Sequence, residues 1–294
     1  MKIGLIDVDG HNFPNLALMK ISAYHKVQGH QVEFVDLFKK YDLVYQSKVF
    51  TFTNDFEYLI NAPKILRGGT GYDLKNTLSI EIENMFPDYK LYDNVKFKNT
   101  AYGFLTRGCP RACPFCIVAE KEGKKSYKVN DLNNFWNGQK NIKLLDPNIL
   151  GSKDRLDLLN QLIESKSWVD FTQGLDARLL NEEITEKLQQ IKIKMLHFAW
   201  DMIDNSDVII DNLKQFKKAT QVDFRKLRVY VLTNFNTTHE QDLYRIYKLK
   251  ELGYDPYIMI FEKWNAPELT KRMARWVNSK FIFRKCEKFE FYKI

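Results

Sequence analysis

The segment TRGCPRACPFC, residues 106–116, contains three of the four cysteines in this chain of 294 residues. Cys109, Cys113 and Cys116 follow one another with the spacing C-x3-C-x2-C. Thiolates this close together usually bind a metal, because soft sulfur ligands suit iron–sulfur clusters and zinc. A structural zinc site normally has four ligands, and the next histidine, His197, is far along the chain. Three close cysteines without an evident fourth ligand favour a 4Fe–4S cluster with one iron open to a small molecule.

Two other kinds of site remain open. A zinc knuckle could be completed by a histidine or by the fourth cysteine, Cys286, and two of the three close cysteines could form a redox-active disulfide. Both explain the spacing less well than a cluster with three protein ligands. Cys286 lies in the aromatic-rich segment Phe281–Tyr292, where we interpret it as a buried structural thiol.

The cysteine spacing, together with Phe115 directly before the third cysteine, resembles the signature of the radical SAM superfamily. The resemblance implies that the open iron binds the amino and carboxylate groups of S-adenosylmethionine (SAM). It also implies that the reduced cluster cleaves SAM to methionine and a 5′-deoxyadenosyl radical. Phe115 would then lie beside the adenine, with its backbone in contact with the base.

The composition is that of a folded protein. Hydrophobic residues make up 45% of the chain and aromatic residues 14%, which is ample for a buried core. Four unevenly spaced cysteines do not suggest a disulfide framework, which favours a reducing cytoplasm. The first residues, MKIGLIDVDGHNF, read as a strand and its loop rather than a signal peptide. No apolar run approaches the ~20 residues that span a bilayer. We expect a soluble cytoplasmic protein with no membrane partner.

The net charge of +8 comes from 45 basic and 37 acidic residues. Such a surplus can attract an anionic partner such as RNA, DNA or a phosphorylated substrate. The lysines are spread over most of the chain, however, and a solvated basic surface explains them equally well.

Residues 1–95 are predicted to form a small Rossmann-like α/β domain. The predicted elements are strands Ile3–Val8, Val32–Leu37 and Leu43–Thr53, a helix Leu16–Val27, and a turn at residues 68–72. This domain is similar to the cobalamin-binding-like domain that precedes the core of many radical SAM proteins. Asp9-Gly10-His11 matches the start of the D-x-H-x-x-G loop, but Pro14 stands where that motif has glycine. We favour a degenerate, structural domain, with cobalamin bound near His11 and Gly68 as the alternative.

Residues 96–265 alternate strand and helix patterns, which predicts a parallel sheet. Six such repeats match the partial (β/α)6 TIM-type barrel of a radical SAM core. The predicted strands are Tyr102–Thr106, Ile142–Leu145, Val169–Thr172, Met195–Trp200, Leu227–Leu232 and Pro256–Ile260. The predicted helices are Asp131–Asn137, one beginning at an N-cap Ser152, Glu182–Ile191, Asp207–Ala219, His239–Leu252 and Pro267–Val277. Residues 266–294 are expected to add this last helix and an aromatic-rich extension, formed as an extra strand or as packed chain.

Polar residues follow several of the predicted strands, where βα barrels place their functional groups. The resemblance implies that Asp146 replaces the family's Gly-Gly-Glu-type stretch and receives the methionine amino group, with Asn148 beside it. The alternative is that Asp146 caps the next helix.

After the third predicted strand, the resemblance implies that Gln173 and Asp176 hold the ribose hydroxyls. Arg178 would pair with the SAM carboxylate in a forked geometry. A buried ion pair between Asp176 and Arg178 is the structural alternative. Asp201 and Asn234 complete the polar strand ends and would contact SAM or the substrate.

The sequence analysis therefore predicts a radical SAM enzyme that abstracts a hydrogen atom from an unidentified substrate, either a small molecule or a nucleic acid. Residues 1–108 hold no cysteine and only Cys286 follows the loop, so a second cluster is not expected. The electron would come from a donor such as flavodoxin or ferredoxin. The alternatives are a cobalamin-dependent radical SAM methyltransferase and a non-catalytic zinc or iron–sulfur protein that binds nucleic acid.

Overall fold

The computed structural model describes residues 1–10, 13–92 and 98–293. The chain divides into two compact units, which are described separately. Unit 1 comprises residues 1–103 and 133–137, and unit 2 comprises residues 104–132 and 138–294. Among the described helices, none is both long enough and apolar enough to cross a membrane.

Unit 1 contains a parallel four-stranded sheet in the order β2-β1-β3-β4. The strands are β1 (Lys2–Asp7), β2 (Gln31–Phe34), β3 (Leu43–Ser47) and β4 (Ile65–Gly68). The order reverses beside β1, as in a doubly wound sheet.

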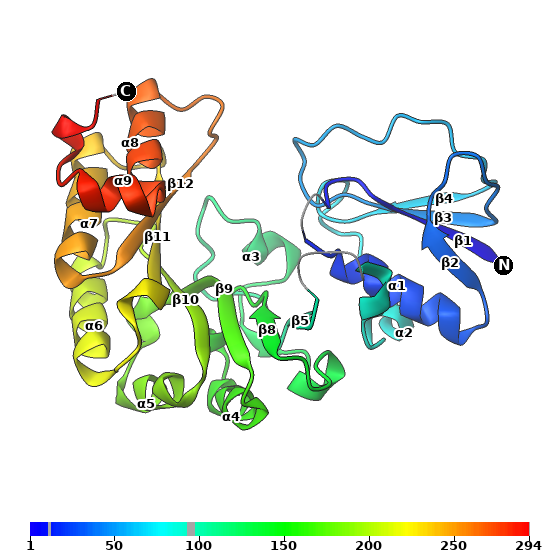
Figure 1. Cartoon of the computed structure of the whole chain (residues 1–294), viewed down its shortest axis with the longest axis horizontal. Helices are drawn as coiled ribbons and strands as arrows, with labels where there is room; N and C mark the ends of the chain where they lie inside the picture. Colours follow the sequence, from blue (N-terminus) through cyan, green and yellow to red (C-terminus); the bar gives the residue numbers. More distant parts are fainter. Residues whose placement is uncertain (11–12, 93–97, 294) are drawn as a thin grey trace. The chain divides into compact units, whose positions relative to one another are not determined.

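Helix α1 (Leu16–Val27) covers one face of this sheet, with the short α2 (Ile80–Glu83) beside it (Figure 1). Asn15 caps α1, because its side chain accepts a hydrogen bond from the Leu18 backbone at 3.2 Å. Leu18 and Ile21 of the helix pack against Ile3 and Leu5 of β1. The helix agrees with its predicted bounds at both ends.

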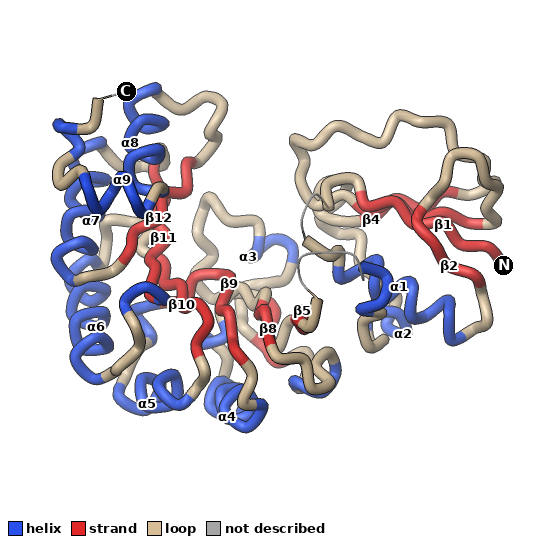
Figure 2. Tube along the Cα trace, viewed as in Figure 1, coloured by secondary structure: helices blue, strands red, loops and turns tan. Residues whose placement is uncertain are grey.

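Strand β3 is shorter than predicted, since it ends at Ser47 rather than Thr53. The Asp9 carboxylate accepts hydrogen bonds from the backbone N–H groups of Val49 (3.0 Å) and Phe50 (2.8 Å). These donors turn toward Asp9 instead of joining a neighbouring strand, and a long loop leads from β3 to β4 (Figure 2). The sequence analysis did not predict β4.

The second sheet has six strands, five of which lie in unit 2 in the order β12-β11-β10-β9-β8. Their bounds are β8 (Asn141–Leu144), β9 (Trp168–Asp176), β10 (Ile193–Ala199), β11 (Leu227–Thr233) and β12 (Asp255–Ile260). All pairings among these five are parallel. The sixth strand, β5 (Thr100–Gly103), is grouped with unit 1. The predicted parallel α/β sheet is confirmed.

The five longest of the described helices of unit 2 line one side of its strands (Figure 1). They are α4 (Arg155–Ser165), α5 (Glu182–Gln190), α6 (Ser206–Ala219), α7 (His239–Leu252) and α8 (Glu268–Asn278). Phe198 of β10 contacts Phe216 of α6 edge to face at 5.3 Å, so this side of the sheet is the apolar core. A capping box at Thr238 starts α7 and Gly253 ends it, and the helix has its predicted bounds, His239–Leu252.

The other side of these strands carries polar groups. The Lys143 ammonium group of β8 lies 3.4 Å from the Asp170 carboxylate of β9. The His197 ring of β10 stacks on Tyr230 of β11 at 4.9 Å, with 5° between the planes. Burial lowers the pKa of His197, so its stacked ring is neutral near pH 7.

Arg245 of α7 is completely buried, with an exposed fraction of 0%. It pairs with Asp242 at 2.6 Å and donates to the carbonyls of Trp200 (2.7 Å), Asp201 (3.0 Å) and Leu232 (2.7 Å). One guanidinium thus holds the carboxyl-terminal ends of β10 and β11 in place.

The bounds of two predicted helices are wrong. Helix α4 begins at Arg155, because the Ser152 hydroxyl accepts from the Asp154 backbone (3.2 Å) and Ser152 ends the short 3₁₀ turn Ile149–Gly151. The predicted helix Asp131–Asn137 is only a 3₁₀ turn at Leu132–Asn134.

The C-terminal segment forms no strand among its described residues. It contains helix α9 (Lys280–Lys285) and a 3₁₀ turn at Phe289–Phe291. Cys286 is partly buried against the apolar cluster around Trp276, whose indole N–H donates to the Cys286 carbonyl at 3.0 Å.

Candidate metal centre

The cysteine loop lies between the two strands of a short ribbon in unit 2. Strands β6 (Thr106–Arg107) and β7 (Tyr127–Lys128) pair antiparallel, and the short helix α3 (Val118–Lys121) lies between them in sequence. The Glu122 carboxylate accepts hydrogen bonds from the Arg107 guanidinium (2.7 Å) and from the Gly108 backbone (3.0 Å). The Cys109 backbone donates to the Gly123 carbonyl at 3.2 Å. These bonds close the base of the loop.

Gly108 has a backbone conformation that requires glycine. Its φ of +75° lies in the left-handed region, and a Cβ at this position would lie 2.1 Å from the Lys125 carbonyl oxygen. The obstacle is backbone, which does not move aside as the end of a long side chain would.

We expect Gly108→Ala to reduce the free energy of unfolding by at least about 3 kcal/mol, since it combines left-handed strain with a backbone clash. Gly138→Ala is the matched control, because Gly138 has a φ of +80° but nothing within 4 Å of its Cβ position. The control should lose only about 1–2 kcal/mol. Urea denaturation followed by tryptophan fluorescence measures both, and equal losses would contradict the proposed clash.

Asp146, directly after β8, anchors the start of the loop. Its carboxylate accepts from the backbone of Leu105 (3.1 Å) and from both the backbone (2.5 Å) and the hydroxyl (2.7 Å) of Thr106. Burial raises the pKa of Asp146 to about 6, although the hydrogen bonds oppose the shift. The structure thus gives Asp146 partners within the chain, and its role toward a SAM amino group remains a prediction.

The three thiols of the loop lie near further polar groups. The Asn148 amide donates to the Cys109 sulfur at 3.5 Å, while its own oxygen accepts from the Gly151 backbone at 3.2 Å. The pKa values of Cys113 and Cys116 are raised. Burial is the main cause, and the charges of Asp201 and the neighbouring thiolates add to the shift. Crowded thiolates of this kind are stabilised by positive charge at their centre.

A cluster and a single metal ion differ in what they require of the three thiols. Within the described part of the chain, no three His, Cys, Asp or Glu side chains are grouped so that they could hold one metal ion. A 4Fe–4S cluster differs from a zinc ion, because each thiolate binds a separate iron and the sulfurs need not converge on one point. Irons would also offset the mutual repulsion that raises the pKa values of Cys113 and Cys116.

Two arginines meet at the carboxyl end of β9. The Asp176 carboxylate accepts hydrogen bonds from Arg111 of the cysteine loop and from Arg178, the latter at 2.7 Å. The ion pair named as the structural alternative for Asp176 and Arg178 is therefore present. Arg178 also carries the positive charge that opposes the raised pKa of Cys113.

Asp201 follows β10 on the same side. Burial raises its pKa to about 6, and the charges of Arg245 and Arg178 act against this shift. Asp201 is thus a partly buried carboxyl group with a perturbed pKa beside cationic side chains, a setting that is common at functional sites.

Three aromatic rings in contact connect the cysteine loop with the carboxyl-terminal ends of β11 and β12. Phe115 contacts Phe235 at 5.3 Å, and Phe235 contacts Phe261 at 5.0 Å, both edge to face. Asn234, with a φ of +63°, directs its amide to the Phe261 carbonyl at 2.9 Å. Phe115 and Asn234 therefore border the same group of rings.

Most of the predicted site residues are connected to the loop by these contacts. Gln173 is the exception: β9 continues through Asp176, so Gln173 lies within the strand and is exposed. The sequence analysis did not identify Arg111, Glu122 or Arg245. Arg245 could have been noticed as the i+3 partner of Asp242 on one helix face.

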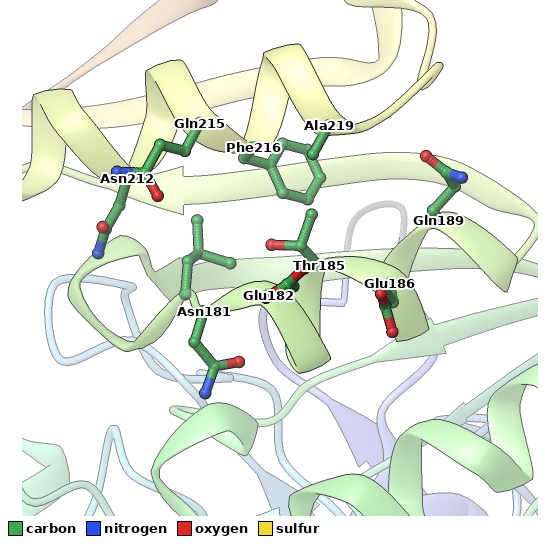
Figure 3. A pocket seen from close by; sticks show the side chains of 10 residues that line it. Asn181, Glu182, Thr185, Glu186, Gln189, Asn212, Gln215, Phe216 and Ala219 are labelled. Atoms are coloured by element: carbon green, nitrogen blue, oxygen red, sulfur yellow. The ribbon is translucent and has the colours of Figure 1, made fainter.

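Two further cavities of the described residues lie away from the cysteine loop. One of 470 Å³ lies between α5 and α6 and is lined by Glu182, Thr185 and Phe216 among others (Figure 3); no residue of the cysteine loop lines it. The other, in unit 1, has 260 Å³ and is lined in part by Gly68 and Gly69. This is less than the ~300–1,000 Å³ typical of drug-sized ligands, and a corrin is larger still. His11, which would be the cobalt ligand in the cobalamin-binding alternative, lies outside the described residues.

No protein-family model matches the chain, and no curated protein is similar to it in sequence. Among solved structures, it is similar to Streptococcus suis SuiB bound to S-adenosylmethionine, with a TM-score of 0.45 and 14% identity over 65% of this chain and 49% of that chain. It is also similar to SuiB bound to the precursor peptide SuiA, with a TM-score of 0.41 and 14% identity over 67% of this chain and 45% of that chain. The chain thus spans about half the length of the solved structures it matches. At these TM-scores the function has to be argued from the residues of this chain.

Proposed function

We propose that this protein is a radical SAM enzyme whose core lies between residues 96 and 265. Cys109, Cys113 and Cys116 would hold one 4Fe–4S cluster. When bound and reduced, the cluster supplies the electron that cleaves SAM to methionine and a 5′-deoxyadenosyl radical, which takes a hydrogen atom from the substrate. The observation that supports this most strongly is a three-thiol loop anchored on both sides, with Asp176, Arg178 and Asp201 at neighbouring strand ends.

The chain's own residues would bind and orient SAM. Arg178 would pair with the SAM carboxylate, since Asp176 already orients its guanidinium. Asp176 and Asp201 would accept hydrogen bonds from the ribose hydroxyls, and Phe115 with Asn234 would border the adenine. Gln173 would have to reach the ribose from within β9.

Asn148 and Asp146, near the thiols, would mainly support the metal ligands. The Asn148 amide would direct a hydrogen bond at the Cys109 sulfur and stabilise its thiolate form. Asp146 would act mainly by fixing residues 105 and 106, from which the loop begins. The electron would come from a flavodoxin or ferredoxin in a reducing cytoplasm, and the substrate would be a small molecule or a nucleic acid. The 260 Å³ cavity of unit 1 gives no reason to include cobalamin.

Anaerobic reconstitution tests the proposal. Protein treated with iron and sulfide should bind about four irons and four sulfides per chain. After reduction with dithionite it should convert SAM to 5′-deoxyadenosine and methionine. A protein that binds only zinc and forms no 5′-deoxyadenosine would refute the proposal and favour a non-catalytic metal-binding protein.

The two arginines on Asp176 allow a matched test of SAM binding. We expect Arg178→Met to weaken SAM binding about tenfold or more, because a charge-assisted hydrogen bond contributes roughly 1.5–3 kcal/mol. Arg111→Met also removes a partner of Asp176 but should weaken binding much less. Isothermal titration of the reconstituted proteins compares the two, and equal affinities in both variants would remove Arg178 from the SAM site.

A further inference from the structure

An open groove of 590 Å³ lies beside the cysteine loop in unit 2. It is lined by Pro110, Lys125, Ser126, Tyr127, Lys128, Gly151, Lys153 and Asp154, and we call it the basic groove. These residues come from three segments: the cysteine loop, the stretch that leads into β7, and the turn before α4.

The walls of the basic groove are in direct contact with the groups that surround Cys109. A Cβ added at Gly151 would lie 3.2 Å from Pro110, so the two residues are closely packed. The Ser126 hydroxyl donates to the Asn148 carbonyl at 2.8 Å, and the Asn148 amide donates to the Cys109 sulfur at 3.5 Å. A molecule in the groove would therefore contact Pro110, which directly follows Cys109, and Ser126, which is linked to the Cys109 sulfur through Asn148.

The groove carries unneutralised positive charge. Lys125 and Lys153 are exposed, as is the adjacent Lys124, and none of the three forms an ion pair with a described residue. Lys128 differs, because it pairs with Asp131 (2.5 Å) and Asp157 (3.2 Å). Asp154 is the single acidic residue in the lining. The surface thus favours a partner that presents carboxylates.

The groove does not include the groups assigned to SAM. Arg178 and Asp201 act on Cys113, at the other end of the loop's first turn. The lining of the basic groove contains neither of them, nor Asp176 or Phe115. In the proposed function, SAM would therefore bind on the side of the loop near Cys113, and the basic groove lies on the side of Pro110.

We infer that the basic groove docks an acidic one-electron carrier protein, with Lys125 and Lys153 as its main contacts. The inference rests on the proposed function, in which each SAM cleavage consumes one electron. The carrier is oxidised by one electron and the SAM sulfonium is reduced by it, with cleavage of the bond between sulfur and C5′. The described thiols provide for one cluster only, so the electron has to come from another molecule.

A protein carrier suits this groove better than RNA does. Single-stranded nucleic acid is usually held along an extended basic track with several aromatic side chains for stacking. Here the unpaired lysines lie on two short segments, and Tyr127, which is 47% exposed, is the one aromatic residue of the lining.

The test compares the charge-reversal variant Lys125→Glu/Lys153→Glu with Lys192→Glu/Lys214→Glu. The control changes two exposed lysines that do not line the groove, and it alters the net charge equally. Binding of oxidised flavodoxin to each reconstituted protein is measured by isothermal titration at low and high salt. Formation of 5′-deoxyadenosine is then measured with reduced flavodoxin and, separately, with dithionite.

We expect the groove variant to lose about tenfold or more in flavodoxin affinity and in the flavodoxin-driven rate at low salt. Its dithionite-driven rate should equal that of the wild type, and the control should behave as the wild type throughout. Equal flavodoxin binding by the wild type and the groove variant would overturn the inference. So would salt-sensitive binding of a single-stranded RNA that depends on Lys125 and Lys153 while flavodoxin binding does not. Absence of 5′-deoxyadenosine with dithionite in the wild type would refute the proposed function, and the binding measurement would still decide on the groove.

Discussion

Cys113→Ala protein is expected to bind little iron and to form no measurable 5′-deoxyadenosine. Loss of a residue that only supports a metal ligand costs roughly 10–100-fold in metal affinity or activity, and loss of a direct ligand should cost more. Cys286, the one cysteine outside the loop, is not placed to replace Cys113 as a ligand. Cys286 packs against the apolar cluster around Trp276, and its thiol donates to the Lys288 carbonyl at 3.2 Å.

Cys286→Ala is the control for this experiment, since it removes a thiol without touching the loop. It should keep its iron, its sulfide and its rate of SAM cleavage. Iron and sulfide analysis after reconstitution, together with chromatographic detection of 5′-deoxyadenosine, measures both variants. If Cys286→Ala loses the metal while Cys113→Ala keeps it, the site is a different one, such as a zinc site that includes Cys286.

Arg245→Met should be strongly destabilising although it leaves the cysteine loop unchanged. Removing one member of a buried ion pair costs about 3–5 kcal/mol, because its partner is left charged and unpaired. Asp242 would be that partner, at 2.6 Å. The carbonyls of Trp200, Asp201 and Leu232 would lose their donor as well, and each unsatisfied buried group adds to the cost.

Arg275→Met provides the comparison, because Arg275 pairs with Glu268 at 2.5 Å on the exposed side of α8. Exposed pairs contribute about 0–1 kcal/mol, so this variant should unfold almost as the wild type does. Urea denaturation of both variants, followed by fluorescence and by circular dichroism, measures the difference. A similar small loss in both would mean that Arg245 does not hold the ends of β10 and β11.

The elements that could be predicted to the residue are those with strong local end signals. Helix α1 starts after an asparagine cap, and α7 begins with a capping box and ends at Gly253. These devices depend on residues within a few positions, which a single sequence displays. The alternation of strand and helix patterns likewise identified β8 to β12 and the parallel sheet.

The errors occurred where distant residues decide the local structure. Strand β3 ends early because Asp9, far away in sequence, accepts the N–H groups of Val49 and Phe50. Ser152 is an exception with a local cause: it looks like a helix cap, but it ends the preceding 3₁₀ turn. The same limit applies to the site: the cysteines stand out by spacing, whereas the bonds of Glu122 to Gly108 and of Arg111 to Asp176 link positions that have no periodic relation.

The anchoring of the cysteine loop bears on how the protein would survive damage. Glu122 and Asp146 hold the loop through oxygen atoms that bind backbone N–H groups, a hydroxyl and a guanidinium. None of these bonds uses a thiol. Oxidation that destroys a cluster would thus leave the loop's backbone connections in place. The polypeptide would be available for repair by fresh iron and sulfide, and its replacement by new synthesis would not be required.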